Sequence, residues 1–217
     1  VTGKSNETAL VRSHSSVDGS LLWSNTIPLT IGTWSALSRI SQFGSGHLVV
    51  IGTEYSSGAS SDLVARVDPT SGQVEWAKTR AKLNPGYSPA ALFDSAGNPI
   101  ILYASDGVAE SALVKLDAVS GNPIWSFEHP AVLQSSERGA VATADGTAVM
   151  LYGKSRNATP PRAWTAHISK VSMADGSLVW GPMQHQARTE FNSANNLVPN
   201  GSDWILVEGR LPSLVVA

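Results

Sequence analysis

The chain has 217 residues, of which 42% are hydrophobic, and its 15 Lys and Arg nearly balance its 17 Asp and Glu, for a net charge of −2. This composition is sufficient for a buried core and excludes disordered and collagen-like classes. The near-neutral charge gives no general attraction to phosphate backbones, so nucleic acid is not an expected partner, and no apolar run approaches the ~18 residues of a membrane helix.

Cysteine is absent, which excludes disulfides, thiolate metal sites and a cysteine nucleophile within these residues. Charged residues make up only 15% of the chain, below the ~25% of typical soluble domains, while Gly contributes 19 residues, Pro 12 and Trp 7. This balance is typical of a turn-rich all-β chain. A helical fold is the competing interpretation, and it fails because no stretch keeps apolar residues at helical spacing between capping signals.

A repeated unit begins with the first residues of the chain. Val1–Ser5 predicts the end of a second strand because it aligns with Leu151–Ser155, and Ala9–Arg12 predicts a third strand. A glycine turn and an outer strand that ends in tryptophan follow at 17–23. The same Gly-x-x-x-Trp pattern recurs at 70–76, 119–125 and 174–180.

The four motif tryptophans are 53, 49 and 55 residues apart, and they are Trp23, Trp76, Trp125 and Trp180. Each of them follows a glycine by four residues, and these glycines are Gly19, Gly72, Gly121 and Gly176. A period of about 50 residues is typical of propeller blades. The repeated ring has a packing explanation, which we prefer over ligand stacking, because one tryptophan per unit fills the wedge between blades and buries roughly 150–250 Å².

The remaining strands of each unit are predicted by apolar runs after a second set of turns. Continuous apolar, largely β-branched runs favour strands that are buried on both faces, and they occur at 48–51, 99–102, 148–151 and 204–207. With an inner strand such as 140–143 and a third strand such as 63–67, each unit has four antiparallel strands. The expected units are a partial blade at 1–23, blades at 24–76, 77–125 and 126–180, and a partial blade at 181–217.

The spacing D-x-x-x-G-x-x-x-W, which begins at Asp68 and again at Asp117, resembles the tryptophan-docking motif of the pyrroloquinoline-quinone (PQQ)-like β-propellers. The resemblance implies a β-propeller of four-stranded antiparallel blades. This superfamily includes quinoprotein alcohol dehydrogenases, an outer-membrane assembly lipoprotein and secreted proteins with no cofactor. Ser15 and Ser172 replace the aspartate in the first and fourth units, where we expect weaker hydrogen bonds.

Both ends of the sequence align within a blade. Val1–Ser5 has no inner strand before it, and Ser213–Ala217 resembles the start of a third strand. We therefore expect about four blades from a longer array, a seven- or eight-bladed propeller. A closed four-bladed ring with a redundant tail is the alternative.

Long connections are expected on one face of the disc, where binding residues vary without disturbing the scaffold. They are expected within blades at 54–61, 105–110 and 154–165, and between blades at 77–88, 126–137 and 181–192. In one of them, Arg162 and Trp164 follow a Pro-Pro pair and belong to residue types that are enriched at binding hot spots. An insertion that folds against its own blade is the alternative for this loop.

The titratable residues predict no catalytic or metal site. The five histidines lack metal-ligand spacing, and the chain has no phosphate-binding loop or nucleophile elbow. Glu54 and Asp106 follow second strands in consecutive units, near the expected central channel, but solvated loop charges are the preferred interpretation. Asn6 and Asn157 begin candidate glycosylation sequons in long loops, whereas Asn200 is better explained by an Asn-Gly hairpin.

We therefore expect a non-catalytic propeller, a rigid scaffold that binds a protein or glycan on the long-loop face, outside the cytosol in an extracellular, cell-surface or periplasmic location. No cofactor is expected. The alternative is a segment of a quinoprotein dehydrogenase, for which the resemblance implies PQQ and calcium held in the central channel by Glu, Asn and Asp side chains. A propeller that acts on polysaccharide is a third hypothesis, but no carboxylate pair with defined geometry supports it.

Overall fold

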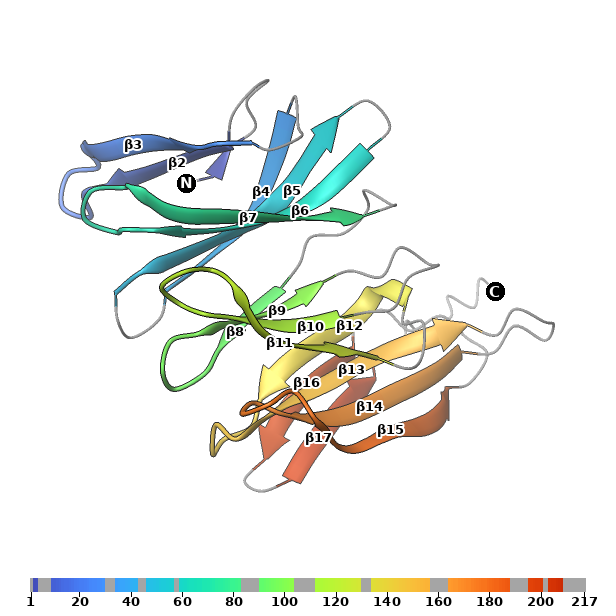
Figure 1. The fold of residues 1–217 in the computed structure, drawn as a ribbon. Helices are drawn as coiled ribbons and strands as arrows, with labels where there is room; N and C mark the ends of the chain where they lie inside the picture. Colours follow the sequence, from blue (N-terminus) through green and yellow to red (C-terminus); the bar gives the residue numbers. More distant parts are fainter. Residues whose placement is uncertain are drawn as a thin grey trace, which may run out of the picture.

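The computed structural model describes residues 2–3, 9–29, 34–42, 46–56, 59–82, 90–103, 112–129, 134–156, 164–187, 195–200 and 203–208. Every regular element in these ranges is a β-strand, and all strand pairs are antiparallel. The sheets follow one another in chain order, from β1–β3 in blue to β16–β17 in red (Figure 1). The expected all-β class is confirmed.

Within the described residues, the strands form three complete four-stranded sheets, one three-stranded sheet and one hairpin. Blade 1 consists of β1 (Thr2–Gly3), β2 (Ala9–His14) and β3 (Leu21–Ile27). Blade 2 consists of β4 (Trp34–Gln42), β5 (Leu48–Ser56), β6 (Ala59–Val67) and β7 (Val74–Lys82). Blade 3 consists of β8 (Ala90–Phe93), β9 (Pro99–Tyr103), β10 (Ala112–Leu116) and β11 (Pro123–Glu128). Blade 4 consists of β12 (Gln134–Ala142), β13 (Ala148–Arg156), β14 (Trp164–Ser172) and β15 (Leu178–Ala187), and the hairpin of β16 (Asn195–Asn200) and β17 (Asp203–Glu208) follows it.

The second and third strands of the blades carry the core, as their apolar runs predict. Every residue of β9 and of β10 is buried. The core lies between blades and not within one: Ile51 and Val64 of blade 2 belong to the same cluster as Ile101 and Val114 of blade 3. Because each fully buried side chain of this kind contributes about 1.5–3 kcal/mol, stacking is the main source of stability.

Each outer strand continues past the tryptophan at which the sequence predicts its end. β7 extends to Lys82, β11 to Glu128 and β15 to Ala187, so the connections expected from 77, 126 and 181 begin later. The loop expected at 54–61 is also mostly strand, because β5 and β6 stay paired to their ends. Polar side chains occupy these extensions, and apolar periodicity therefore does not reveal them. Residues 105–110 lie outside the described part of the chain, as does Ser213–Ala217.

The turn before each outer strand is held by a side-chain cap. Asp68 Oδ1 accepts hydrogen bonds from the backbone N–H groups of Thr70 and Ser71 at 2.9 and 2.7 Å. The hydrogen bond from the Ser71 backbone has the largest effect on the Asp68 carboxyl, and together these bonds lower its pKa below the usual value. Gly72 then adopts φ +73°, which favours glycine because it has no Cβ.

Where serine replaces the cap aspartate, an aspartate three residues later in the same turn accepts hydrogen bonds as well. Ser15 Oγ accepts from the Val17 N–H at 3.1 Å, a longer contact than those of Asp68. Asp18, three residues later, accepts from the backbone N–H and the hydroxyl of Ser20 at 3.0 and 2.8 Å. The expectation of weaker bonds therefore describes the serine alone, since Asp18 provides a second cap within the same turn.

Docked tryptophans join consecutive blades. Trp76 in β7 donates from Nε1 to the carbonyl oxygen of Ala118 at 3.0 Å, and its ring lies on Gly121 in the β10–β11 turn. A Cβ on Gly121 would lie 2.7 Å from that ring, so no other residue fits there without a shift. The same two contacts join Trp23 to Pro69 and Gly72, and Trp125 to Met173 and Gly176.

A charged pair adds a second connection between blades 3 and 4. Lys115 Nζ lies 2.7 Å from Asp94 Oδ2 and donates to the carbonyl oxygen of Met173 at 2.9 Å, and both charged side chains are only 10% exposed. Burial is the largest influence on the pKa of Asp94 and raises it. Hydrogen bonds from Lys115 and Asn98 and the charge of Lys115 outweigh this effect, so the pKa lies below its usual value.

Two histidines fill the junction between blades 3 and 4 beyond Trp125. His129 is fully buried and its Nε2 lies 3.1 Å from Ser169 Oγ. Its ring is nearly perpendicular to that of His167, which is 4% exposed, and the ring centroids are 5.9 Å apart. Burial, and secondarily the neighbouring His129, lowers the pKa of His167.

Matched glycine substitutions separate tryptophan docking from backbone strain. Gly19 and Gly72 both have φ +73°, but nothing lies within 4 Å of a Cβ on Gly19, whereas a Cβ on Gly72 would lie 2.4 Å from the Trp23 ring. We predict that Gly19→Ala lowers the free energy of unfolding by roughly 1–2 kcal/mol and Gly72→Ala by about 1–3 kcal/mol more. Urea unfolding measures both values, and equal losses would contradict docking as a source of stability.

Acid is predicted to weaken the histidine-filled junction. The unfolded chain protonates His167 near its ordinary pKa of 6.5, while the folded chain resists until lower pH. The free energy of unfolding should therefore fall as the pH drops below 6.5, by at most about 1.4 kcal/mol per pH unit for this proton. His167→Gln should reduce the slope between pH 7.5 and 5, and His14→Gln, at an exposed position, should not. An unchanged slope in His167→Gln would refute this prediction.

Candidate functional site

A groove of about 450 Å³ lies between the outer strand of blade 2 and the outer half of blade 3. Strand β7 forms one wall with Lys78, Thr79 and Arg80, and strands β10 and β11 form the other. Its volume lies within the range of ligand-binding clefts, about 300–1,000 Å³.

The groove is open because of the residues that follow the docked tryptophan on each outer strand. Side chains two and four residues after the tryptophan point to the same side, toward the next blade. At the junction of blades 1 and 2 the fourth residue is Ile27, 1% exposed, and at the junction of blades 3 and 4 it is the fully buried His129. In β7 these positions are Lys78 and Arg80, whose charges resist burial, and the space remains open.

The floor of the groove is apolar and its far edge is polar. Val114 and Leu116 of β10 are buried and contribute to the floor. Across from them, Ser126 and Glu128 of β11 pair in register with Val114 and Ala112 and lie on the same face of blade 3. An apolar floor with a few polar groups is the usual composition of a binding site.

An aromatic ring and a side-chain amide hold the two cations of the groove in place. The Arg80 guanidinium lies over the Tyr103 ring, 4.9 Å from its centroid, in a cation–π contact. Lys78 Nζ donates to Asn122 Oδ1 at 3.1 Å. Burial, and secondarily the charge of Asp62, raises the pKa of Tyr103 to about 12, although the charge of Arg80 acts in the opposite direction. The phenol therefore stays protonated at neutral pH. The groove therefore presents two fixed cations, which suits the binding of an anionic group.

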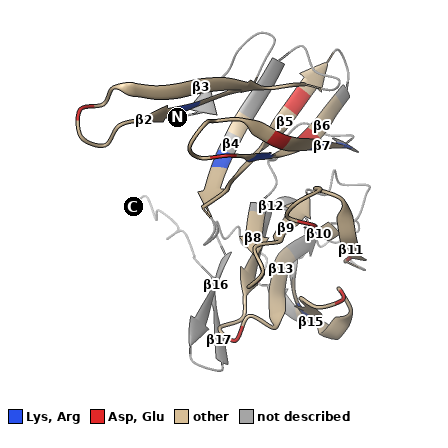
Figure 2. Cartoon of the chain, turned by 60° about the vertical axis from the view of Figure 1, so that its left-hand side comes forward, with Lys and Arg blue, Asp and Glu red and all other residues tan. Residues whose placement is uncertain are grey.

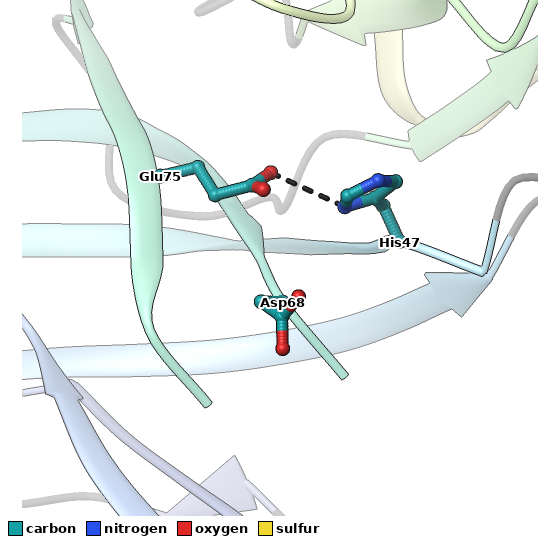
Figure 3. A group of neighbouring side chains, drawn as sticks. All are labelled: His47, Asp68 and Glu75. Atoms are coloured by element: carbon teal, nitrogen blue, oxygen red, sulfur yellow. Dashed lines mark ion pairs between the residues drawn. The ribbon is translucent and has the colours of Figure 1, made fainter. Parts of the chain in front are cut away.

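Charged residues of both signs occur on neighbouring strands of blade 2 (Figure 2). A second polar cluster in this blade brings together His47, Asp68 and Glu75 (Figure 3). One possible ligand atom from each lies within 4.8 Å of those from the other two, and His47 Nδ1 is 3.2 Å from Glu75 Oε2. Arg66 also contacts Glu75, through its Nε. Nitrogen and carboxylate donors in this arrangement are able to hold a divalent metal.

The residues that we singled out from the sequence do not meet at one site. Trp23, Trp76 and Trp125 dock on Gly72, Gly121 and Gly176 at blade junctions. Gly19 has nothing within 4 Å of its Cβ position, and Trp180 is 37% exposed. Glu54 is fully buried in β5, so its interpretation as a solvated loop charge is wrong. Trp164 begins β14, where it pairs with Arg156 and Ala187. Asn6, Asp106, Asn157 and Arg162 lie outside the described residues.

Sequence reasoning missed both the groove and the histidine cluster. The β7 wall of the groove follows Trp76, and its polar edge at Ser126 and Glu128 follows Trp125, where we expected loops. The cluster joins residues 47, 68 and 75, whose separations in sequence match no metal-binding pattern. The signal that was available is the alignment of repeats, which shows charged residues in β7 where the other outer strands have apolar or neutral ones.

One family of known proteins matches most of the chain. The part of the chain that the structure describes has no helix of the length and hydrophobicity that crossing a bilayer requires. No curated protein is similar in sequence at a significant level. A family model described as outer membrane protein assembly factor BamB matches residues 7–210, nearly the whole repeat array. The chain therefore belongs to the PQQ-like propeller repeat family.

Proposed function

We propose that this chain is a non-catalytic interaction platform, and that the groove between blades 2 and 3 binds an extended, acidic segment of a partner protein. The observation that carries the proposal is the groove itself: Lys78 and Arg80 stand over an apolar floor of about 450 Å³ at a junction between rigid blades.

Charge and shape favour this class of partner. Lys78 and Arg80 lie two residues apart on one strand, about 7 Å along the chain, which matches the spacing of alternate side chains in an extended peptide. Carboxylates at those positions would reach both cations while apolar side chains contact Val114 and Leu116. Glu128 at the far edge disfavours a uniformly acidic ligand, so we propose a segment in which acidic and apolar residues alternate.

The family supports a role in protein interaction. The matching family model is described as an assembly factor of the outer membrane, and assembly factors act through contacts with other proteins. By this analogy we propose a location outside the cytosol, in the periplasm or at the cell surface. A glycan remains the other ligand class for such a platform, but a neutral sugar would not use the two cations.

The dehydrogenase alternative needs a donor set for PQQ and calcium in the central channel. Among the described residues, Glu54 is buried within blade 2 and pairs in register with Ser61. Asp106, the other carboxylate that we considered from the sequence, lies outside the described residues. We propose a function without this cofactor, because the buried position of Glu54 gives no support for a carboxylate ligand in an open channel.

Binding to defined peptides tests the proposal. We expect saturable binding, by fluorescence anisotropy, of a blocked nine-residue peptide that alternates Glu and Leu, and weaker binding of its Gln–Leu analogue. Arg80→Gln should weaken binding about tenfold or more, because a hydrogen bond to a charged group is worth about 1.5–3 kcal/mol. Arg39→Gln, on exposed β4, is the matched control and should leave the affinity unchanged.

Three results would contradict the proposal. They are the absence of peptide binding, equal affinity in Arg80→Gln and wild type, and a stoichiometric complex with PQQ and Ca²⁺ detected by a red-shifted cofactor spectrum. Preferential binding of a neutral oligosaccharide would likewise reject the peptide as the ligand.

A further inference from the structure

We propose that His47, Asp68 and Glu75 form a Zn²⁺ site in blade 2, on the edge that carries the β6–β7 turn. The site is separate from the groove and does not depend on the proposed function. It would act as a structural staple, because its three donors come from three different segments of the sheet.

Strand register and a β-bulge bring the donors together. Leu48 pairs with Val67, and Val67 pairs with Val74, so these three residues form one row across the sheet. Each donor is the direct chain neighbour of one residue in this row: His47 precedes Leu48, Asp68 follows Val67 and Glu75 follows Val74. The register shifts between Arg66 and Val67, because Arg66 pairs with Trp76. Glu75 is therefore the extra residue of a bulge, a feature that redirects a side chain.

The other blades provide an internal comparison. The same bulge occurs before Trp125 and Trp180, where the extra residues are Ile124 and Val179. The residues aligned with His47 in blades 3 and 4 are Asn98 and Thr147. Only blade 2, among the complete blades, thus combines an imidazole and two carboxylates at these three positions.

The imidazole lies beside one of the carboxylates. His47 Nδ1 is buried and lies 3.2 Å from Glu75 Oε2, with which it forms an ion pair when the ring is protonated. When the ring proton is on Nε2, the Nδ1 lone pair faces Glu75 instead and is able to bind a metal ion. Arg66 contacts the same Glu75 oxygen, so a metal ion would bind the other oxygen of Glu75 or replace this contact.

Neighbouring groups hold both carboxylates in place, as they commonly do for metal ligands. Asp68 Oδ1 accepts three hydrogen bonds from Thr70 and Ser71, which leaves Oδ2 for an ion. Arg66 contacts Glu75 and also donates to the carbonyl oxygen of Ala118 in blade 3, and ligating carboxylates are commonly held by such outer partners. Two carboxylates and one guanidinium leave a net charge of −1, which still attracts a dication.

The donor chemistry selects Zn²⁺ over Ca²⁺ and Mg²⁺, which prefer all-oxygen sites. Zn–N and Zn–O bonds of about 2.0–2.2 Å require the donors to lie closer than their present 4.8 Å limit. His47 and Glu75 are 29% and 32% exposed, so their side chains have room to move inward. Water would complete the coordination.

Calorimetric titration of the intact, metal-free chain with Zn²⁺ tests the site. We expect one equivalent to bind, a higher unfolding temperature with Zn²⁺, and no comparable effect of Mg²⁺. His47→Gln and Glu75→Gln should each weaken binding at least tenfold and remove the thermal shift. His14→Gln, which removes an exposed histidine elsewhere, should change neither.

Co²⁺ provides a readout that does not depend on folding of the variants. Its d–d absorption in the wild-type chain should show low-coordinate nitrogen and oxygen ligation, and Zn²⁺ should displace it. Failure of Zn²⁺ to bind, unchanged binding in both His47→Gln and Glu75→Gln, or loss of binding in His14→Gln would overturn the proposal.

Discussion

An indole ring on a glycine of the next blade is the contact on which the rest of this structure depends. Trp23, Trp76 and Trp125 each cover such a glycine and each donate to a carbonyl oxygen of the same turn. The ring requires a glycine, the glycine requires a capped turn, and the turn starts the strand that carries the next tryptophan. One local rule therefore propagates from blade to blade, and it fixes the spacing between their buried strands.

Differences between blades appear where this rule leaves the side chains free. Beyond the docked ring, the outer strand places its next residues against the neighbouring blade. An isoleucine or a histidine closes the junction there, whereas Lys78 and Arg80 leave it open. Blade 2 also carries Glu75 at its bulge, where blades 3 and 4 have Ile124 and Val179. The two candidate binding features thus lie at variable positions of a constant scaffold.

Repetition made the architecture predictable from the sequence, and the features that differ between repeats were harder to predict. The Gly-x-x-x-Trp motif and the β-branched runs predicted the blades, their strand order and the buried strands. Strand ends were missed because β5, β6 and β7 continue through polar residues whose backbones remain paired. Glu54 was misplaced for the same reason. The groove and the histidine cluster depend on which side chains meet between strands, a relation that residue spacing does not express.

Hydrogen exchange in a Trp76→Ala variant tests most directly whether docking ties the blades together. Trp76 belongs to β7, and the turn that it contacts lies more than 40 residues later, between β10 and β11. The account predicts faster amide exchange in both β7 and the segment 112–121, detected by mass spectrometry after proteolysis. Faster exchange confined to blade 2, with the segment 112–121 unchanged, would contradict it.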